Sequence, residues 1–179
     1  MRGSTTMVLA LLLAAVSTPV AAQMEPAADA SCPATPAPLP AALAGWADKA
    51  AMTAATKASR PTLADAQLTL GKAVDLALKP TPEVAYPLRP AKPGGVASHG
   101  GLVGFSVTEA GTYRVALGSG AWIDVVRGGK AAASTAHGHG PACSGVRKTV
   151  DFPLTPDRYI LQIAGNGTPS IAVMVTRLP

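Results

Sequence analysis

Two histidines separated by one residue are the part of this sequence best suited to chemistry. They are His137 and His139, in the glycine-rich stretch STAHGHGPACSG, residues 134–145. In a β-strand this spacing would place both imidazoles on one face, about 6–7 Å apart by the rise per residue. Two imidazoles so placed can chelate copper, zinc or iron, with His99 as a third ligand and Asp124 as a carboxylate ligand. The alternative is a surface loop that binds no metal.

The two cysteines, Cys32 and Cys143, bear on the same stretch. The thiolate of Cys143 would suit a soft metal, but only where it is not oxidised. Export brings a protein into an oxidising compartment, where an even number of cysteines favours a disulfide. We therefore expect a bridge between the two, which would close a loop of about 110 residues and fasten the N-terminal region to the folded body.

A second set of residues could bind a ligand rather than a metal. Trp122 stands at the start of an expected strand, where its indole could stack on a sugar ring. Arg147 and Lys148 form the one adjacent pair of basic residues in the chain and could meet an anionic ligand. The alternative for all three is packing at the rim of the core and ordinary solvation of a strand's outer face.

The first 22 residues are expected to direct export. Arg2 precedes an apolar run at residues 7–16, which has the usual length of a signal-peptide core and is too short to cross a bilayer as a helix. The small residues VAA end at Ala22, where we expect cleavage. The sequence therefore predicts a periplasmic or secreted protein with no membrane span after cleavage.

The number and distribution of charged residues indicate which kinds of binding partner suit the chain. Its 179 residues include 15 Lys and Arg against 10 Asp and Glu, a net charge of +5. The basic residues are scattered and form no stripe that would suit nucleic acid, so no nucleic-acid partner is expected. An envelope polysaccharide or a partner protein suits this mild positive charge.

The pattern of apolar residues changes at residue 66. Residues 23–65 are rich in alanine, proline and threonine and are expected to form an irregular arm, with Trp46 as its hydrophobic anchor. Over residues 66–179, short runs with apolar residues at every second position alternate with turn signals such as Gly128-Gly129. The pattern predicts an all-β, antiparallel, jelly-roll-like β-sandwich of about eight strands.

Three of the alternating runs are expected to meet as the core of this sandwich. Each run presents one apolar face, because alternate side chains of a strand point to the same side. The residues on these faces are Tyr113, Val115 and Leu117, then Tyr159, Leu161 and Ile163, then Ile171, Val173 and Val175.

Two longer stretches carry a resemblance to a known family. They are GGLVGFSVTEAGTYRVALGSGAWIDVVRGGKAAAS and VDFPLTPDRYILQIAG. They resemble the strand pairs F-x-V-x-x-x-G-x-Y-x-V-x-L and L-x-P-G-x-Y-x-L-x-V of bacterial pre-peptidase C-terminal domains, with Asp157 at the second pattern's glycine. The resemblance covers residues 66–178 and implies a secreted, jelly-roll-like accessory module without a catalytic site.

The chain as a whole resembles a group of small exported bacterial proteins. The shared features are Trp46, Tyr86-Pro87 and the stretch AHGHGPAC. Some members of this group carry a homogentisate 1,2-dioxygenase label. That label implies a metal-dependent dioxygenase, a class that holds iron with two histidines and a glutamate.

Three classes of function follow from the sequence. The first is an exported, non-enzymatic module that binds an envelope component or a partner protein and needs no cofactor. The second is a metal-binding protein that uses the His-x-His loop with copper, zinc or iron. The third is the metal-dependent dioxygenase that the group's label implies. Hydrolases are disfavoured, because the chain has no G-x-S-x-G motif and few paired carboxylates.

Overall fold

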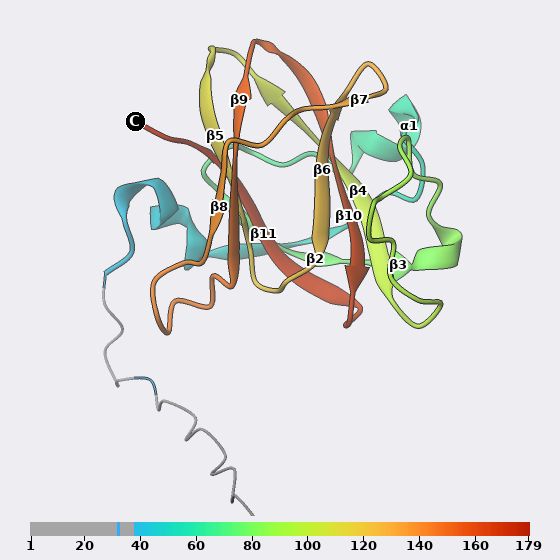
Figure 1. Cartoon of the computed structure of the whole chain (residues 1–179), viewed down its shortest axis with the longest axis horizontal. Coiled ribbons are helices and arrows are strands. Elements are labelled where there is room, and N and C mark those ends of the chain that lie inside the picture. Colours follow the sequence, from blue (N-terminus) through green and yellow to red (C-terminus); the bar gives the residue numbers. More distant parts are fainter. Residues whose placement is uncertain (1–31, 33–37) are drawn as a thin grey trace, which may run out of the picture. The chain divides into compact units, whose positions relative to one another are not determined.

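A computed structural model describes Cys32 and residues 38–179. The expected signal peptide, residues 1–22, lies outside these residues. The described part forms two β-sheets, one of six strands and one of five, which pack face to face (Figure 1). The predicted all-β sandwich is confirmed, with more strands than the eight expected. In this part of the chain, no helix has the length and apolarity that a membrane crossing requires.

The two sheets are built as follows. In spatial order, the six-stranded sheet consists of β1 (Lys49–Thr53), β2 (Ala73–Ala77), β11 (Ser170–Arg177), β5 (Gly111–Leu117), β9 (Lys148–Leu154) and β8 (Ala136–Gly138). The five-stranded sheet consists of β3 (Lys79–Pro80), β4 (His99–Val107), β10 (Asp157–Asn166), β6 (Trp122–Arg127) and β7 (Lys130–Ala131). The helical elements are η1 (Ala41–Trp46), α1 (Arg60–Ala64) and η2 (Thr81–Glu83).

The core lies between the sheets, on the faces that the alternation predicts. All nine residues expected there are buried and belong to one hydrophobic cluster. They come from β5 and β11 in one sheet and from β10 in the other, so each sheet supplies one wall. Burial of such side chains stabilises the fold by about 1.5–3 kcal/mol each. The period-two pattern therefore fixes which face of each strand points inward.

The glycine pair between β6 and β7 makes the two-residue hairpin turn that the sequence predicts. Gly128 and Gly129 have φ values of +55° and +74°, and Arg127 pairs with Lys130 across the turn. Two consecutive residues with positive φ are the requirement of a type I′ turn, which only glycine meets without strain.

The N-terminal arm is more ordered than its composition predicts. Its β1 pairs in parallel with β2 and forms an edge of the six-stranded sheet. Its η1 covers the outer face of the same sheet, where Leu43 and Trp46 pack on Ala116 and Met174 in a second hydrophobic cluster. Trp46 is 2% exposed, which confirms its role as the anchor of the arm. The expectation of an irregular arm missed these elements, because small alanines give no periodic signal.

The expected disulfide is present. Cys32 and Cys143 are bridged, with their Cα atoms 5.5 Å apart and a sequence separation of 111. Cys143 lies in the turn between β8 and β9. The bridge therefore fastens the start of the described arm to the glycine-rich stretch.

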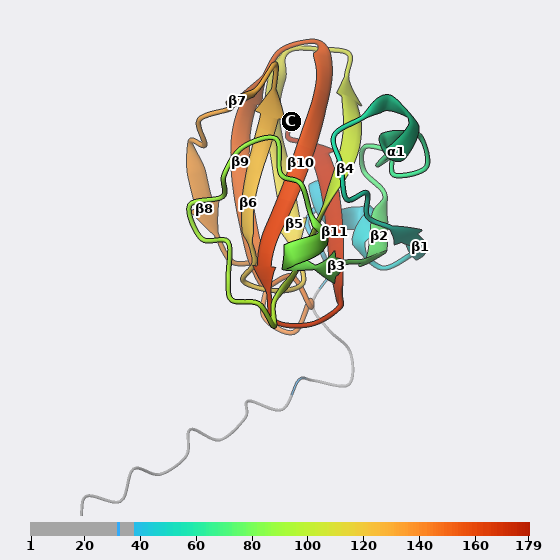
Figure 2. The same ribbon diagram turned by 90° about the vertical axis from the view of Figure 1, so that its right-hand side faces the viewer.

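A long connection covers the outer face of the five-stranded sheet. The segment between η2 and β4, residues 84–98, crosses β6 and β10, as the light-green ribbon in Figure 2 shows. Gln162 of β10 is fully buried beneath it and donates from Nε2 to the backbone oxygen of Leu88. The same Nε2 donates to Asp124 Oδ2 on β6, 2.7 Å away. The connection is thus hydrogen-bonded to the sheet that it covers.

Candidate functional site

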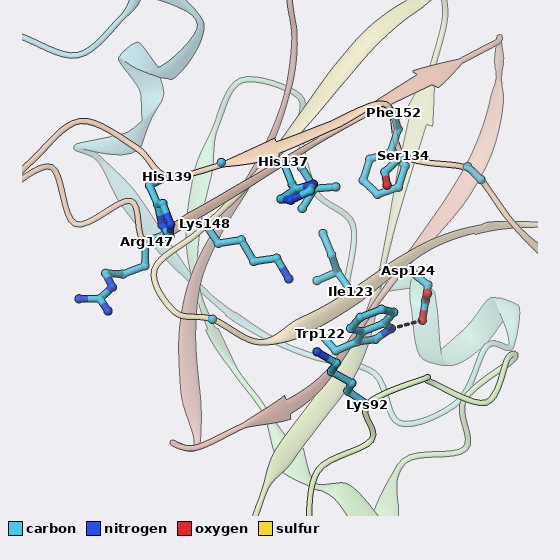
Figure 3. Close-up of a pocket in the computed structure, with 14 residues that line it drawn as sticks. Lys92, Trp122, Ile123, Asp124, Ser134, His137, His139, Arg147, Lys148 and Phe152 are labelled. Carbon is cyan, nitrogen blue, oxygen red and sulfur yellow. Dashed lines mark hydrogen bonds between the residues drawn. The ribbon is translucent and has the colours of Figure 1, made fainter.

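A cleft of about 660 Å³ opens between β6 of one sheet and the β8–β9 edge of the other. Its size is within the range of about 300–1,000 Å³ that small-molecule sites occupy. Figure 3 shows its charged and aromatic side chains converging from β6, β8, β9 and the segment 84–98. These side chains include Lys92, Trp122, Asp124, His137, His139, Arg147 and Lys148.

Of the eight side chains that the sequence singles out for metal or ligand binding, six line this one cleft. They are Trp122, Asp124, His137, His139, Arg147 and Lys148. Cys143 is bound in the disulfide, and His99 starts β4 away from the cleft, where its backbone pairs with Pro80 and Asn166. The structure therefore brings the ligand-binding candidates together with two of the three imidazoles, and leaves the third elsewhere.

His137 points into the cleft because of its register on the sheet edge. It stands opposite Val150 in the antiparallel β8–β9 ladder, and directly paired residues share a face of a sheet. Val150 belongs to the core cluster, so that face is the inner one. The core ends here, and Ile123 and Phe152 form the apolar lining beside His137 (Figure 3).

Trp122 is held in a fixed orientation at the cleft. Its Nε1 donates to Asp124 Oδ2 at 3.0 Å, and the same oxygen accepts the hydrogen bond from the buried Gln162. Two donors on one carboxylate oxygen fix its position, which in turn fixes the indole. The residue remains partly exposed to solvent.

Two ammonium groups lie beside this ring. Lys92 Nζ is 5.7 Å and Lys148 Nζ 5.9 Å from the centroid of Trp122, which is within reach of a cation–π interaction. Lys148 Nζ also donates to the backbone oxygen of Ala121 at 2.8 Å. Burial lowers the pKa of Lys148 from its ordinary value of 10.5, and the charge of Lys92 lowers it further, against an opposing effect of Asp124.

The positive charge of the cleft is not neutralised by ion pairs within the described residues. Lys92, Arg147 and Lys148 line the cleft against a single carboxylate, Asp124. Over Cys32 and residues 38–179 the ion pairs are Arg114 with Asp151, Arg127 with Asp157, and Arg177 with Glu109. The cleft therefore favours a ligand with negative charge.

The side chain of His139 is oriented by the backbone. Its Nδ1 lies 2.7 Å from the carbonyl oxygen of Arg147. Because a carbonyl only accepts, Nδ1 carries a proton in this contact, and in the neutral ring Nε2 presents a lone pair. His139 is thus able to accept a hydrogen bond or to ligate a metal through Nε2.

The turn that carries His139 and Arg147 is a hydrogen-bonded structure. Gly140 donates from its backbone to the Val146 carbonyl at 3.1 Å, and Ser144 Oγ donates to the Pro141 carbonyl at 2.6 Å. From outside the turn, Trp46 Nε1 donates to the Ser144 carbonyl at 3.1 Å. The glycines of this stretch therefore permit a defined turn, which the arm and the disulfide hold in place.

The donor set does not fit a metal centre. Zinc sites and the iron sites of non-haem oxygenases use three or four protein ligands, and no group of three His, Cys, Asp or Glu side chains in the described part of the chain is placed to hold a metal. Cys143 is oxidised, and Asp124 already accepts two hydrogen bonds. His137 and His139 alone would leave a metal short of ligands.

Lys92 is the residue that sequence reasoning missed. It lies in the proline-broken stretch YPLRPAKPGG, which has no periodicity to place it on an element. Its approach to Trp122 depends on how the segment 84–98 crosses the sheet, which is a tertiary property. The proline content indicated a connection there, and nothing in the sequence located its path.

Comparison with known proteins adds no relative: no protein-family model matches the chain, and no curated protein sequence does. The resemblance to pre-peptidase C-terminal domains stays a prediction, and function has to be argued from the cleft.

Proposed function

We propose that this protein is an exported, non-enzymatic binding module and that its cleft binds an envelope polysaccharide. The observation that carries the proposal is Trp122, a partly exposed indole whose Nε1 is fixed by Asp124. Sugar rings present apolar C–H faces that pack on aromatic rings. A ring that is already immobilised loses little conformational freedom on binding, which favours affinity.

The extent of the hollow surface suits a polymer. Beyond His139 and Arg147 the cleft adjoins a second hollow of about 580 Å³, which these two residues also line and which ends at the disulfide. A ligand that lies on Trp122 can continue past Arg147 along the surface. An extended chain uses this length, whereas a small solute would fill only the first part.

The chemistry of the lining supports binding rather than catalysis. Glycoside hydrolysis commonly needs two carboxyl groups about the scissile bond, and the residues that line the cleft include one, Asp124. Ser134 and His137 also line it, but Asp151, the nearby acid on β9, is bound through both oxygens to Arg114. No serine–histidine–acid arrangement is assembled from these residues.

The disulfide supports the compartment that we propose. The Cys32–Cys143 bridge suits an oxidising compartment, such as the periplasm or the extracellular space. This supports the proposal of export that the first 22 residues suggest, and envelope polysaccharides are available in that compartment.

A glycan array followed by calorimetric titration tests the proposal. We expect Trp122→Ala to lower the affinity for the bound glycan by about tenfold, since aromatic packing contributes about 0.5–1.5 kcal/mol beyond burial. Trp122→Phe should retain part of it. Trp46 is the other tryptophan of the chain and is buried, so ligand-induced changes of fluorescence should come from Trp122. Lack of binding to any glycan, or unchanged affinity in Trp122→Ala, would refute the proposal.

A further inference from the structure

We infer that the polysaccharide is acidic, and that Lys92 and Lys148 hold a sugar carboxylate beside the Trp122 ring. The inference rests on the proposed function, because it names the ligand class of the same cleft. It goes further in assigning the charge of the ligand and the side chains that recognise it.

The first observation is the convergence of two ammonium groups on one aromatic ring. Their Nζ atoms lie 5.7 and 5.9 Å from the centroid of Trp122. They come from separate parts of the fold, Lys92 from the segment 84–98 and Lys148 from the start of β9. Figure 3 shows the lysines and the indole facing one hollow. A sugar that lies on this ring would place a substituent within reach of both lysines.

The second observation is that both ammonium groups retain donor capacity. An ammonium has three N–H donors, and Lys148 uses one of them on the Ala121 carbonyl. The ion pairs of the described residues do not include Lys92 or Lys148. A carboxylate accepts several hydrogen bonds at once and is the natural partner of such free ammonium donors.

The third observation is electrostatic. Burial and, after it, the charge of Lys92 lower the pKa of Lys148, against an opposing effect of Asp124. A carboxylate between the two lysines would offset that repulsion and stabilise both charges. Arg147 adds a third cation where the cleft continues toward the second hollow, so that a polymer with repeated acid groups would be recognised at more than one point.

Uronic acid oligomers and their carboxyl-reduced, neutral counterparts test this inference directly. The two probes share the sugar ring and differ in the acid group. We expect the full chain to bind the acidic oligomer at least about tenfold more tightly, since hydrogen bonds to charged groups exceed neutral ones. The affinity should fall as the salt concentration rises, because the charges are partly exposed.

Three variants assign the effect to the lysines. We expect Lys92→Gln/Lys148→Gln to reduce binding of the acidic oligomer to the level that the same variant shows for the neutral one. Lys130→Gln is the matched control, because Lys130 is exposed at the far end of β6, in the hairpin to β7, and should have no effect. Lys148→Arg should retain most of the affinity for the acidic oligomer.

The outcomes separate this inference from the proposed function. Equal binding of the acidic and neutral oligomers, with dependence on Trp122, would overturn the inference and leave the binding module standing. The same holds if the double lysine variant merely melts at a lower temperature and binds both oligomers normally, because the lysines would then only pack on the indole. Binding to phosphatidylglycerol vesicles but to no glycan would overturn both proposals.

Discussion

Lys148 is both a structural donor and a member of the cleft. Its hydrogen bond to the Ala121 carbonyl joins the start of β9 to the residue before β6, and the residue is partly buried. Such residues keep a charged head near water while the stem is buried. The cost of partial burial appears as the lowered pKa of the ammonium.

This lowered pKa predicts how ligand binding depends on pH. Above about pH 7.5 a sugar acid is ionised. The charged groups that act on the Lys148 ammonium are Lys92 and Asp124. As pH rises through the lowered pKa of Lys148, below the ordinary 10.5, the ammonium loses its proton and affinity for an acidic oligomer falls.

Calorimetric titrations between pH 7.5 and 10 measure this decline. Lys148→Arg is the matched variant, because a guanidinium remains charged over the whole range. Its affinity should stay level to higher pH than that of the natural protein. Identical pH profiles for the two proteins would show that Lys148 does not contact the acid group.

Among the elements, η1 and the turn between β8 and β9 depend on each other. Trp46 packs with Val146 in the second hydrophobic cluster and donates from Nε1 to the Ser144 carbonyl. Lys49 Nζ lies 5.2 Å from the centroid of the Trp46 ring. The arm therefore supports the turn from which His139 and Arg147 reach the cleft.

Removal of this support should affect stability and binding together. We expect Trp46→Ala to lower the free energy of unfolding by about 3–5 kcal/mol, the usual range for an aromatic residue removed from a packed site. Trp46→Phe keeps most of the packing and loses the hydrogen bond, which should cost about 1 kcal/mol. Urea unfolding measures both. A loss for Trp46→Ala no larger than that for Trp46→Phe would argue against the packing of η1 on the sheet.

The same comparison of elements shows what sequence reasoning can reach. The buried faces of strands such as β10 and β11 can be predicted from the sequence, because their apolar residues alternate. The edge strand β1 was missed, since KAAMT has no alternation and its parallel pairing with β2 is decided by tertiary contacts. The alternating region is expected to begin at residue 66, but residues 67–70 contribute only one isolated bridge, Gln67 with Gly104.

For the candidate site, the sequence indicates individual residues but not how the tertiary structure brings them together. Residue type alone singled out Trp122 and His137, and the adjacent pair Arg147-Lys148 stood out by its charge. Their meeting in one cleft required the register of β8 on β9 and the separation of the two sheet edges. No local sequence pattern predicts this register or this separation. Nor does a pattern predict the path of the segment 84–98, which carries Lys92.

At the scale of the whole described unit, two separate hydrophobic clusters stabilise the fold. The larger fills the space between the sheets, and the smaller joins the arm to the outer face of the six-stranded sheet. Neither cysteine belongs to either cluster. The disulfide therefore acts on the connection between arm and sandwich and adds nothing to the packing of the core.

This division predicts that the bridge contributes stability without being required for the fold. A link across 111 positions removes conformational freedom from the unfolded chain, and the chain-entropy model gives about 4–5 kcal/mol for a loop of that length. We expect Cys32→Ser/Cys143→Ser to lower the free energy of unfolding by up to this amount and to keep the β-sheet circular dichroism spectrum of the natural protein. Its glycan affinity should change by less than about threefold, because Trp46 still bonds to Ser144 and Val146 still packs beneath the turn. Reduction of the natural protein should reproduce these effects, whereas collapse of binding in a folded double variant would show that the bridge alone positions Arg147.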